Sequence, residues 1–484
     1  MENNCLRLIE KSNRPDLWAK YLFAVEYVQY GFVSELTKQT YFETIKYVNG
    51  FFEERPRKRN KEEFLNHFIE LIDSIKANGY DSTQGRPLQI TVDNRIIDGA
   101  HRLAACAAMG INIPFNNVEP EQLQDYSFSK LEQLGLSESI TFHLLRQILI
   151  GQNDYRILLI FPIVDNSNTL ESLLLDFQDD IIFRKDLVIN LNLLLVVNYL
   201  SYVIGDGLEE TPTWVGSKRN PFSALNQHAY LSHGDHPLRI IIVRSHETSL
   251  IIKREIRKLI GIGNYSCHTS DSQFETLLLC EQIFDETSRS FAMNCGLGAP
   301  IEVLITLTFL LRKFRLQRLT GEYIFVVGST LLSILGLRDI NDIDVFYDFP
   351  VESFNSEKDS SRLSVNCVSN ENSVVTRKIL NHYGWYNFLG LQIISLDGLA
   401  QLKRERYEVP KDIEDLETID RYRLDSTANH LHTTRTPKKS TIKRRTLWRV
   451  IRIRELIRFN LLDKPKLFRL ARMAYRLFLI KWLR

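Results

Sequence analysis

Five consecutive residues at a predicted strand-to-helix junction, Asp98-Gly99-Ala100-His101-Arg102, are of the types that bind phosphate. A glycine allows backbone amides to approach a ligand closely, and a helix start presents unpaired N–H groups with a partial positive charge. Arg102 adds a forked donor suited to phosphate oxygens. The stretch therefore predicts a nucleotide phosphate site, and the alternative is a tight packing turn with a solvent-exposed His-Arg pair.

The sequence IIDGAHRLAACAAMGI around this junction resembles the motif of the ParB/sulfiredoxin superfamily. In that superfamily a Gly-x-His-Arg or related stretch at a helix N-terminus holds nucleotide phosphates. The similarity covers residues 86 to 119, and it implies nucleotide-binding roles for Asp98, Gly99, His101 and Arg102. Some members bind DNA and use CTP, whereas others phosphorylate a small molecule or a protein with ATP. The resemblance thus implies nucleotide binding more strongly than any one reaction.

A second junction combines a Gly-Ser turn with two closely spaced carboxylates. Gly328 and Ser329 follow an apolar run, and after twelve intervening residues come Asp342 and Asp344 in DIDVFYD. Residues i and i+2 of a strand point to the same face, so both carboxylates are able to hold one or two Mg²⁺ ions. The amides and hydroxyl of the turn are suited to phosphate. The alternative is that both aspartates are only turn acids on an edge strand.

The stretch VVGSTLLSILGLRDINDIDVFYD resembles the signature of the DNA polymerase β-like nucleotidyltransferase superfamily. By that resemblance Gly328 and Ser329 position the triphosphate, while Asp342 and Asp344 are catalytic metal ligands. It implies a nucleotidyltransferase-like domain at residues 297–430 that uses Mg²⁺ and ATP or another NTP.

Downstream, LQIISLDGLAQLKRERYEVPKDIEDLETI resembles a segment of many smaller members of that superfamily. This makes three residues candidate nucleotide-binding groups through phosphate contacts, Lys403, Arg406 and Lys411. Active members usually supply a third carboxylate from a later strand, but here Gln392 lies in the middle of that strand and Asp397 at its end. Three interpretations stay open: Asp397 is the third catalytic acid, the site works with one metal ion, or the domain binds nucleotide or phospho-sugar without adenylyl transfer.

A third candidate lies in GNYSCHTSDSQFET, after the cationic segment KREIRK. His268 and Asp271, at a predicted helix start, are suited to bind phosphate or to exchange protons near neutral pH. Ser270 or Asp271 is predicted to cap that helix, and a purely structural polar cap is the alternative. A solvated loop is favoured over a metal site for the nearby histidines, which lack ligand periodicity: His228, His233 and His236.

The hydrophobic patterning predicts a multidomain α/β and α+β protein. In the N-terminal part Phe64, Phe68, Leu71 and Ile72 form one helical stripe that Gly79 closes. The uncharged run at 187–205 is predicted to be a buried helix or strand pair, and a membrane span is the weaker alternative because asparagines interrupt the run. The chain is predicted to divide into five parts: a helical lead-in at 1–78, a ParB/sulfiredoxin-like unit at 79–125, a central α/β domain at 150–296, a nucleotidyltransferase-like domain at 297–430, and a linker with a basic amphipathic tail at 431–484.

The 484 residues are 44% hydrophobic and 25% charged, which excludes a wholly disordered or collagen-like chain. A net charge of +2 conceals a basic end, because the last 50 residues hold 17 Lys and Arg and two acids. This tail predicts amphipathic helices whose expected partner, through residues 440–484, is an anionic membrane surface, with nucleic acid or the acidic body of the chain as alternatives. The N-terminus has no signal-peptide pattern and the cysteines are scattered, so we expect a cytoplasmic protein, peripheral at the inner face of the membrane.

These features predict a nucleotide-dependent phosphoryl or nucleotidyl transferase, that is, a kinase or nucleotidyltransferase. The middle region resembles stretches of multidomain bacterial proteins linked to surface polysaccharides, which makes a small molecule or a glycan, such as a cell-envelope precursor, the expected acceptor. One alternative is a DNA-associated ParB-like protein or a toxin-type nucleotidyltransferase. The other is a non-catalytic nucleotide-binding scaffold.

Overall fold

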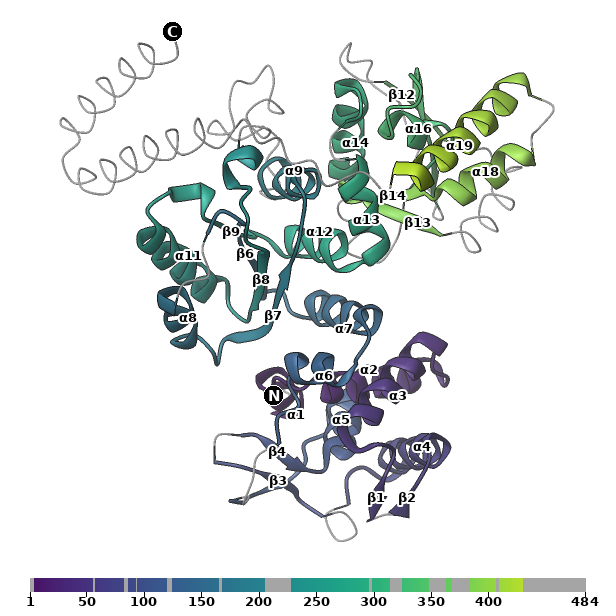
Figure 1. Cartoon of the computed structure of the whole chain (residues 1–484). Helices are drawn as coiled ribbons and strands as arrows, with labels where there is room; N and C mark the ends of the chain where they lie inside the picture. The colour runs from purple at the N-terminus through teal and green to yellow at the C-terminus, as the bar shows by residue number, and fades with distance from the viewer. Residues whose placement is uncertain are drawn as a thin grey trace. The chain divides into compact units, whose positions relative to one another are not determined.

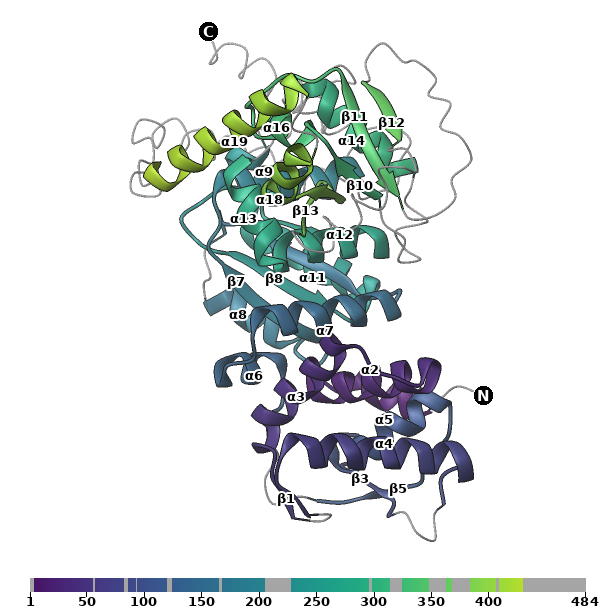
Figure 2. The same ribbon diagram turned by 90° about the vertical axis from the view of Figure 1, so that its right-hand side faces the viewer.

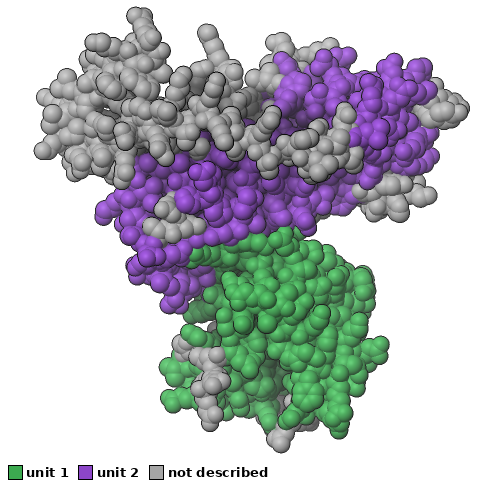
Figure 3. All heavy atoms as spheres, viewed as in Figure 1, with its two compact units in different colours: residues 1–153, 182–185 green, residues 154–181, 186–484 purple. Residues whose placement is uncertain are grey.

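The computed structural model arranges the chain as a mixed α/β protein of two compact units (Figure 1, Figure 3). Unit 1 comprises residues 1–153 with 182–185, and unit 2 comprises residues 154–181 with 186–484. The predictions for Arg406 and for the tail at 431–484 lie outside the described residues. The structure describes residues 4–54, 57–81, 86–92, 94–119, 124–164, 168–204, 228–295, 298–313, 324–347, 363–367, 384–405 and 409–429.

Unit 1 is built mainly of helices. The predicted apolar stripe of α4 is confirmed for Phe64, Phe68 and Ile72, which are buried, whereas Leu71 at its margin is only half-buried. The helix begins after Asn60, whose side chain accepts a hydrogen bond from the Glu63 backbone N–H, and ends at a glycine as predicted. The helices are α1 (Asn4–Lys11), α2 (Pro15–Tyr30), α3 (Glu35–Asn49), α4 (Lys61–Asn78), α5 (Ala100–Met109), α6 (Phe128–Leu134) and α7 (Glu138–Gly151), with a short hairpin of β1 (Glu53–Glu54) and β2 (Arg57–Lys58).

The predicted order of strand, turn, strand, glycine and helix is confirmed in unit 1. β3 (Leu88–Ile90) pairs antiparallel with β4 (Ile96–Asp98) and parallel with β5 (Phe115–Asn117). Gly99 then begins α5, which ends at the predicted glycine. Alanines line much of α5, and their small side chains allow α1 and α2 to pack closely against it. The lead-in helices and the junction therefore belong to one folded unit.

The central four-stranded sheet has the strand order β7-β8-β6-β9, with β6 antiparallel to both β8 and β9. Its strands belong to unit 2 except for residues 182–185 of β7, which are grouped with unit 1. Its central strands are buried along their length because helices α8 and α11 cover one face and α12 packs on the other (Figure 1). This confirms the predicted central layer of strands and helices. The strands are β6 (Arg156–Ile160), β7 (Ile181–Leu187), β8 (Leu238–Val243) and β9 (Cys267–Thr269).

The uncharged run at 187–205 forms helix α9, continued directly by the π-helix η1, and most of its side chains are buried. Within the described parts of the chain, every helix is too short or too polar to cross a membrane. The helices of this region are α8 (Asn168–Leu175), α9 (Leu191–Tyr199), η1 (Leu200–Ile204), α11 (His246–Ile260), η2 (Gly263–Tyr265), α12 (Gln273–Phe284) and α13 (Glu286–Cys295).

The second sheet of unit 2 has the strand order β12-β11-β10-β14-β13. β11 runs antiparallel to β10, whereas β14 runs parallel to β10 and β12 parallel to β11. The end of β10 and the starts of β11 and β12 therefore meet at one edge of the sheet. The strands are β10 (Ile324–Val327), β11 (Asp342–Tyr347), β12 (Ser364–Cys367), β13 (Trp385–Phe388) and β14 (Leu391–Ile394).

Four helices accompany this second sheet. The predicted succession of strand, Gly-Ser turn, helix and Asp-x-Asp strand is confirmed as β10, α16 and β11. Figure 2 shows α18 and α19 side by side next to α16, which brings the basic downstream helix to the turn. The helices are α14 (Ile301–Lys313), α16 (Thr330–Ile334), α18 (Leu396–Arg404) and α19 (Pro410–Asn429).

Candidate functional site

The sheet edge brings the Gly-Ser turn against the Asp-x-Asp strand. Val327, the last residue of β10, pairs with Asp344 of β11, so the turn that follows lies over the carboxylates. Gly328 has a φ of 70°, a left-handed conformation that favours glycine. A Cβ added at Gly328 would also overlap the carboxylate of Asp344. Glycine is therefore required here both for the turn and for the close approach of an acidic side chain.

Three oxygen-bearing side chains gather at this edge. Asp342 and Asp344 lie on the same face of β11, and Asn366 of the neighbouring strand β12 donates a hydrogen bond from Nδ2 to Asp342 Oδ2 at 2.6 Å. Carboxylate and amide oxygens are the hard ligands that Mg²⁺ prefers, with water or substrate phosphates completing its shell. The donor set therefore fits one Mg²⁺ ion. The described residues contain no group of three His, Cys, Asp or Glu able to hold a metal, because the third member here is an amide.

The strand expected to carry a third acid lies elsewhere, and so does the one candidate acid, Asp397. Gln392 is buried in β14, which is separated from β11 by β10. Asp397 is exposed in the first turn of α18 and forms an ion pair with Arg423 of α19. The residue at the strand position beside the carboxylate pair is Asn366, which the sequence analysis did not single out. In the sequence around Asn366, only the short alternating run SVNC indicates a strand. The pairing of this strand with β11 cannot be predicted locally, because it depends on the tertiary fold.

Ser329 is held in a network of charged groups that we call the anion cluster: Ser329, Arg338, Lys403, Asp412 and Asp415. The Ser329 hydroxyl donates to Asp415 Oδ2 at 3.0 Å, and Lys403 Nζ lies 3.3 Å from Ser329 Oγ. Lys403 Nζ is also 2.5 Å from Asp412 Oδ1 and 2.8 Å from Asp415 Oδ2. Arg338 donates to both Ser329 and Asp415. The structure thus brings together two of the residues that the sequence analysis named separately as nucleotide-binding candidates, Ser329 and Lys403.

The charges of the anion cluster balance, with two cations facing two carboxylates. The side chains of Lys403 and Asp415 are 3% and 2% exposed. Burial alone would raise the pKa of Asp415, but hydrogen bonds and charges from Lys403 and Arg338 outweigh it and lower that pKa. The two aspartates therefore occupy donors that a phosphate group would use. Lys411, by contrast, is exposed in the first turn of α19.

Arg338, Asp412 and Asp415 were missed as functional residues by the sequence analysis. Arg338 stands four residues before Asp342 in the loop between α16 and β11. The two aspartates have the Asp-x-x-Asp spacing that places both on one helix face toward α18. That spacing was visible in the sequence, but their contact with Ser329 depends on how α19 packs.

At the unit 1 junction the arginine and the histidine point in different directions. Arg102 donates to Asp98 Oδ2 at 2.9 Å and to the backbone carbonyl of Arg86, and its side chain is 18% exposed. Gly99 has a φ of 92°, and a Cβ there would come within 2.5 Å of the Leu88 side chain. Asp98, Gly99 and Arg102 are therefore adjacent at the start of α5, as predicted.

His101 instead lies among aromatic rings in unit 1. Its Nε2 is 2.9 Å from the hydroxyl of Tyr41, and its ring contacts that of Phe68 edge-on at 4.8 Å. Burial lowers the pKa of His101 well below the usual value, with the charges of Lys20 and Lys58 acting in the same direction. His101 therefore packs among aromatic rings, and the alternative of a fully solvent-exposed His-Arg pair does not describe the histidine.

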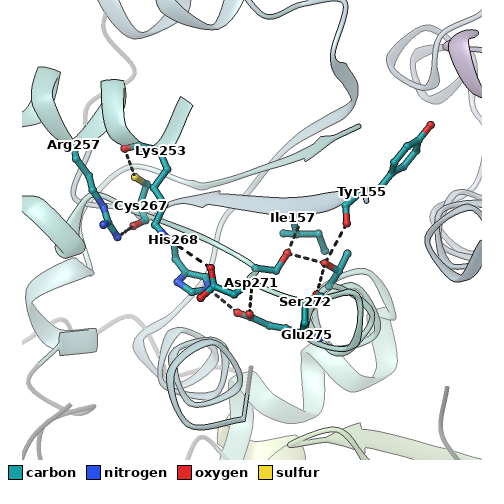
Figure 4. A network of polar contacts seen from close by, with 11 residues as sticks. Tyr155, Ile157, Lys253, Arg257, Cys267, His268, Asp271, Ser272 and Glu275 are labelled. Carbon is teal, nitrogen blue, oxygen red and sulfur yellow. Dashed lines mark hydrogen bonds and ion pairs between the residues drawn. The ribbon is translucent and has the colours of Figure 1, made fainter. Parts of the chain in front are cut away.

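The third candidate is a buried polar network in the central region (Figure 4). His268 Nε2 lies 2.5 Å from Glu275 Oε1, and Glu275 Oε2 accepts a hydrogen bond from the backbone N–H of Asp271 at 2.7 Å. Burial lowers the pKa of His268 and raises the pKa of Glu275, because removal from water disfavours the charged form of each group. The network joins β9 to α12 and has the properties of a structural element.

The predicted cap of α12 is corrected by one residue. Ser272, and neither Ser270 nor Asp271, caps the helix by accepting from the Glu275 N–H. The hydroxyl of Ser270 instead accepts a hydrogen bond from the backbone N–H of Ile157 in β6.

The predicted solvated loop is wrong for His228. This residue begins a short helical segment, is buried, and contacts Ser232 Oγ through Nδ1 at 3.3 Å. Burial lowers the pKa of His228 to about 3. His233 and His236 follow in the loop before β8.

Comparisons with known proteins add no assignment. No protein-family model matches the chain, and no curated protein or solved structure is detectably similar to it.

Proposed function

We propose that unit 2 is a Mg²⁺-dependent transferase that binds a nucleoside triphosphate at the sheet edge and transfers a nucleotidyl or phosphoryl group. The observation that carries the proposal is the meeting of Gly328-Ser329 with Asp342 and Asp344 at one edge. The neighbouring Lys403 supports it, because a cation close to Ser329 suits the phosphates that the turn amides would hold. The resemblance to DNA polymerase β-like nucleotidyltransferases is consistent with this assignment.

Each residue has a defined role in the proposal. Asp342 and Asp344 would bind Mg²⁺, which when bound neutralises phosphate charge. Ser329 and the turn amides orient the terminal phosphates, while Lys403 and Arg338 offset the charge that develops during transfer. Positioning and electrostatics of this kind dominate phosphoryl-transfer chemistry. The proposed acceptor is a hydroxyl of a small molecule or a glycan.

A second candidate function, nucleotide binding without transfer, is favoured by one specific observation. Asn366 stands where a third carboxylate would increase the negative charge beside Asp342. With two carboxylates the edge suits one metal ion, and a second ion would lack anionic ligands. Turnover therefore decides between the two functions.

The test is the pair of substitutions Asp342→Asn and Asp344→Asn in the full chain. We expect Mg²⁺-dependent binding of ATP or another NTP, measured by calorimetry, to weaken at least tenfold and release of pyrophosphate or nucleoside diphosphate to stop. Asp176→Asn with Asp179→Asn, two exposed carboxylates of unit 2, is the matched control for lost charge. Wild-type binding and turnover in the Asp342/Asp344 variant would remove the transferase proposal. Binding without any turnover in the wild type would favour the second function.

A further inference from the structure

A groove of about 470 Å³ lies in unit 2 between α13, β13 and the ends of α16, α18 and α19. Its size falls in the range of roughly 300 to 1,000 Å³ that is common for small-molecule sites. Aromatic rings form one part of the lining, from Phe291, Tyr386 and Tyr422. Neither the phosphate chemistry of the anion cluster nor the carboxylate pair uses these residues.

The groove is connected to the anion cluster through three separate elements. Leu335, the C-cap of α16, lines the groove six residues after the N-cap Ser329, and Leu396 lines it seven residues before Lys403 on α18. On α19, Tyr422 lines it seven residues after Asp415. At 1.5 Å per helical residue, each element places its groove residue about 9 to 10.5 Å from its cluster residue. A ligand that reaches both places must therefore be extended, with its phosphates at one end and its ring at the other, as in a nucleoside triphosphate.

The chemistry of the lining suits a flat heteroaromatic ring. Phe291 and Tyr386 are stacked, with ring centroids 4.4 Å apart and planes inclined by 5°. Three exposed polar residues, spaced by four on one face of α13, add a carboxylate, a hydroxyl and an amide: Glu286, Ser290 and Asn294. Nucleobases are bound in this way, by stacking on aromatic side chains and by hydrogen bonds to the polar edge.

We propose that the groove binds the base and ribose of the nucleoside triphosphate whose phosphates lie at the anion cluster. This inference rests on the proposed function and adds the place where the nucleotide base is recognised. Tyr386 is held in position, because its hydroxyl accepts a hydrogen bond from the Leu396 N–H at 3.3 Å. The groove would thus distinguish a nucleotide from a bare polyphosphate.

The test compares two probes, Mg²⁺–NTP and Mg²⁺–tripolyphosphate, on the full chain by calorimetry. Ser290→Trp fills the groove from an exposed helix position, and Asn294→Ala removes an edge contact. Glu417→Trp introduces the same indole at an exposed position of α19 outside the groove, and serves as the matched control. We expect the affinity for Mg²⁺–NTP to fall at least tenfold in Ser290→Trp and severalfold in Asn294→Ala. The affinity for Mg²⁺–tripolyphosphate should stay within twofold of the wild-type value in both variants.

The outcomes separate this inference from the proposed function. Unchanged NTP affinity in Ser290→Trp, or an equal loss for both probes, overturns the groove as the base site and leaves the Asp342/Asp344 proposal standing. Equal affinity of the wild type for both probes also overturns it. If neither probe binds the wild type, both the proposed function and the groove fail. A loss confined to the acceptor reaction, with NTP binding intact, would make the groove an acceptor site and reject the inference.

Discussion

At the scale of single residues, Asp415 is the carboxylate that the donors of the anion cluster share. Its carboxylate takes hydrogen bonds from Ser329, Lys403 and Arg338, the same donors that a triphosphate would need. A bound phosphate must therefore displace Asp415 or share its donors. The carboxylate also lies between the buried Lys403 and the half-buried Arg338 and offsets the repulsion between these two cations, while Asp412 pairs with Lys403 alone.

Asp415→Asn is predicted to have opposite effects on stability and on binding. Loss of one charge from a buried pair should lower the free energy of unfolding by about 2 to 4 kcal/mol. Because Lys403 and Arg338 then carry excess positive charge, tripolyphosphate affinity should rise about tenfold. Urea unfolding measures the change in stability, and calorimetry measures the change in affinity. The control is Asp420→Asn, because Asp420 is an exposed carboxylate that forms an ion pair at the surface. Reduced stability with unchanged or weaker polyphosphate binding would contradict the idea that Asp415 competes with phosphate.

Acid should reproduce part of this destabilisation. The pKa of Asp415 is lower in the folded chain than in the unfolded one, so its stabilising contribution is present at neutral pH. That contribution is lost as the pH falls below the unfolded value of about 3.9 toward the lower folded pKa.

Local signals identify the elements, but contacts between them decide the site. The turn from β10 into α16 was predictable because the apolar run, Gly328 and the Asp-x-Asp alternation are all local. The position of β12 beside β11 could not be predicted from the local sequence. Asn366 was therefore not recognised, and Asp397 was the expected third acid. Likewise the Gly-x-His-Arg junction was predictable as strand, turn and helix. The burial of His101 beneath Tyr41 depends on how α3 and α4 pack, which no local pattern encodes.

Packing of the central elements also creates a pH dependence. His228 lies between the rings of Tyr202 and Tyr265, and burial lowers its pKa to about 3. Below the unfolded pKa of about 6.5, the unfolded chain takes up a proton that the folded chain does not. The contribution of His228 to the free energy of unfolding is therefore fully present above about pH 6.5 and is lost as the pH falls toward the pKa of His228 in the folded chain.

His228→Phe is predicted to remove this contribution. Between about pH 7.5 and 5.5, the free energy of unfolding of the wild type should fall by about 1.4 kcal/mol more than that of the variant, the linkage of one proton. Denaturant unfolding at both pH values measures the difference. Ser232→Ala removes the hydroxyl next to His228 but keeps the imidazole, so it should retain the wild-type pH dependence. Equal pH dependence in wild type and His228→Phe would show that His228 is charged or exposed when folded.

The whole molecule carries one candidate phosphate site in each compact unit. In unit 1, Gly99 begins a helix beside Arg102, and in unit 2 Gly328 precedes a helix start beside Arg338. The sites differ in electrostatics, because only unit 2 places an Asp-x-Asp pair next to its glycine turn. Mg²⁺ should therefore strengthen binding at the second site far more than at the first.

We therefore expect two separable nucleotide-binding events, one in each unit. Arg102→Ala should weaken nucleotide binding at the unit 1 site at least tenfold, since it removes the forked donor, and leave the Mg²⁺-dependent event unchanged. Asp342→Asn should do the reverse. Calorimetry and thermal shift on the full chain resolve the events, because a ligand at about 100 times its Kd adds about 2.7 kcal/mol of stability. Arg57→Ala, an exposed arginine elsewhere in unit 1, controls for lost charge. If Arg102→Ala binds nucleotide like the wild type, the junction at Gly99 is a packing turn; if it abolishes both events, the two sites do not bind independently.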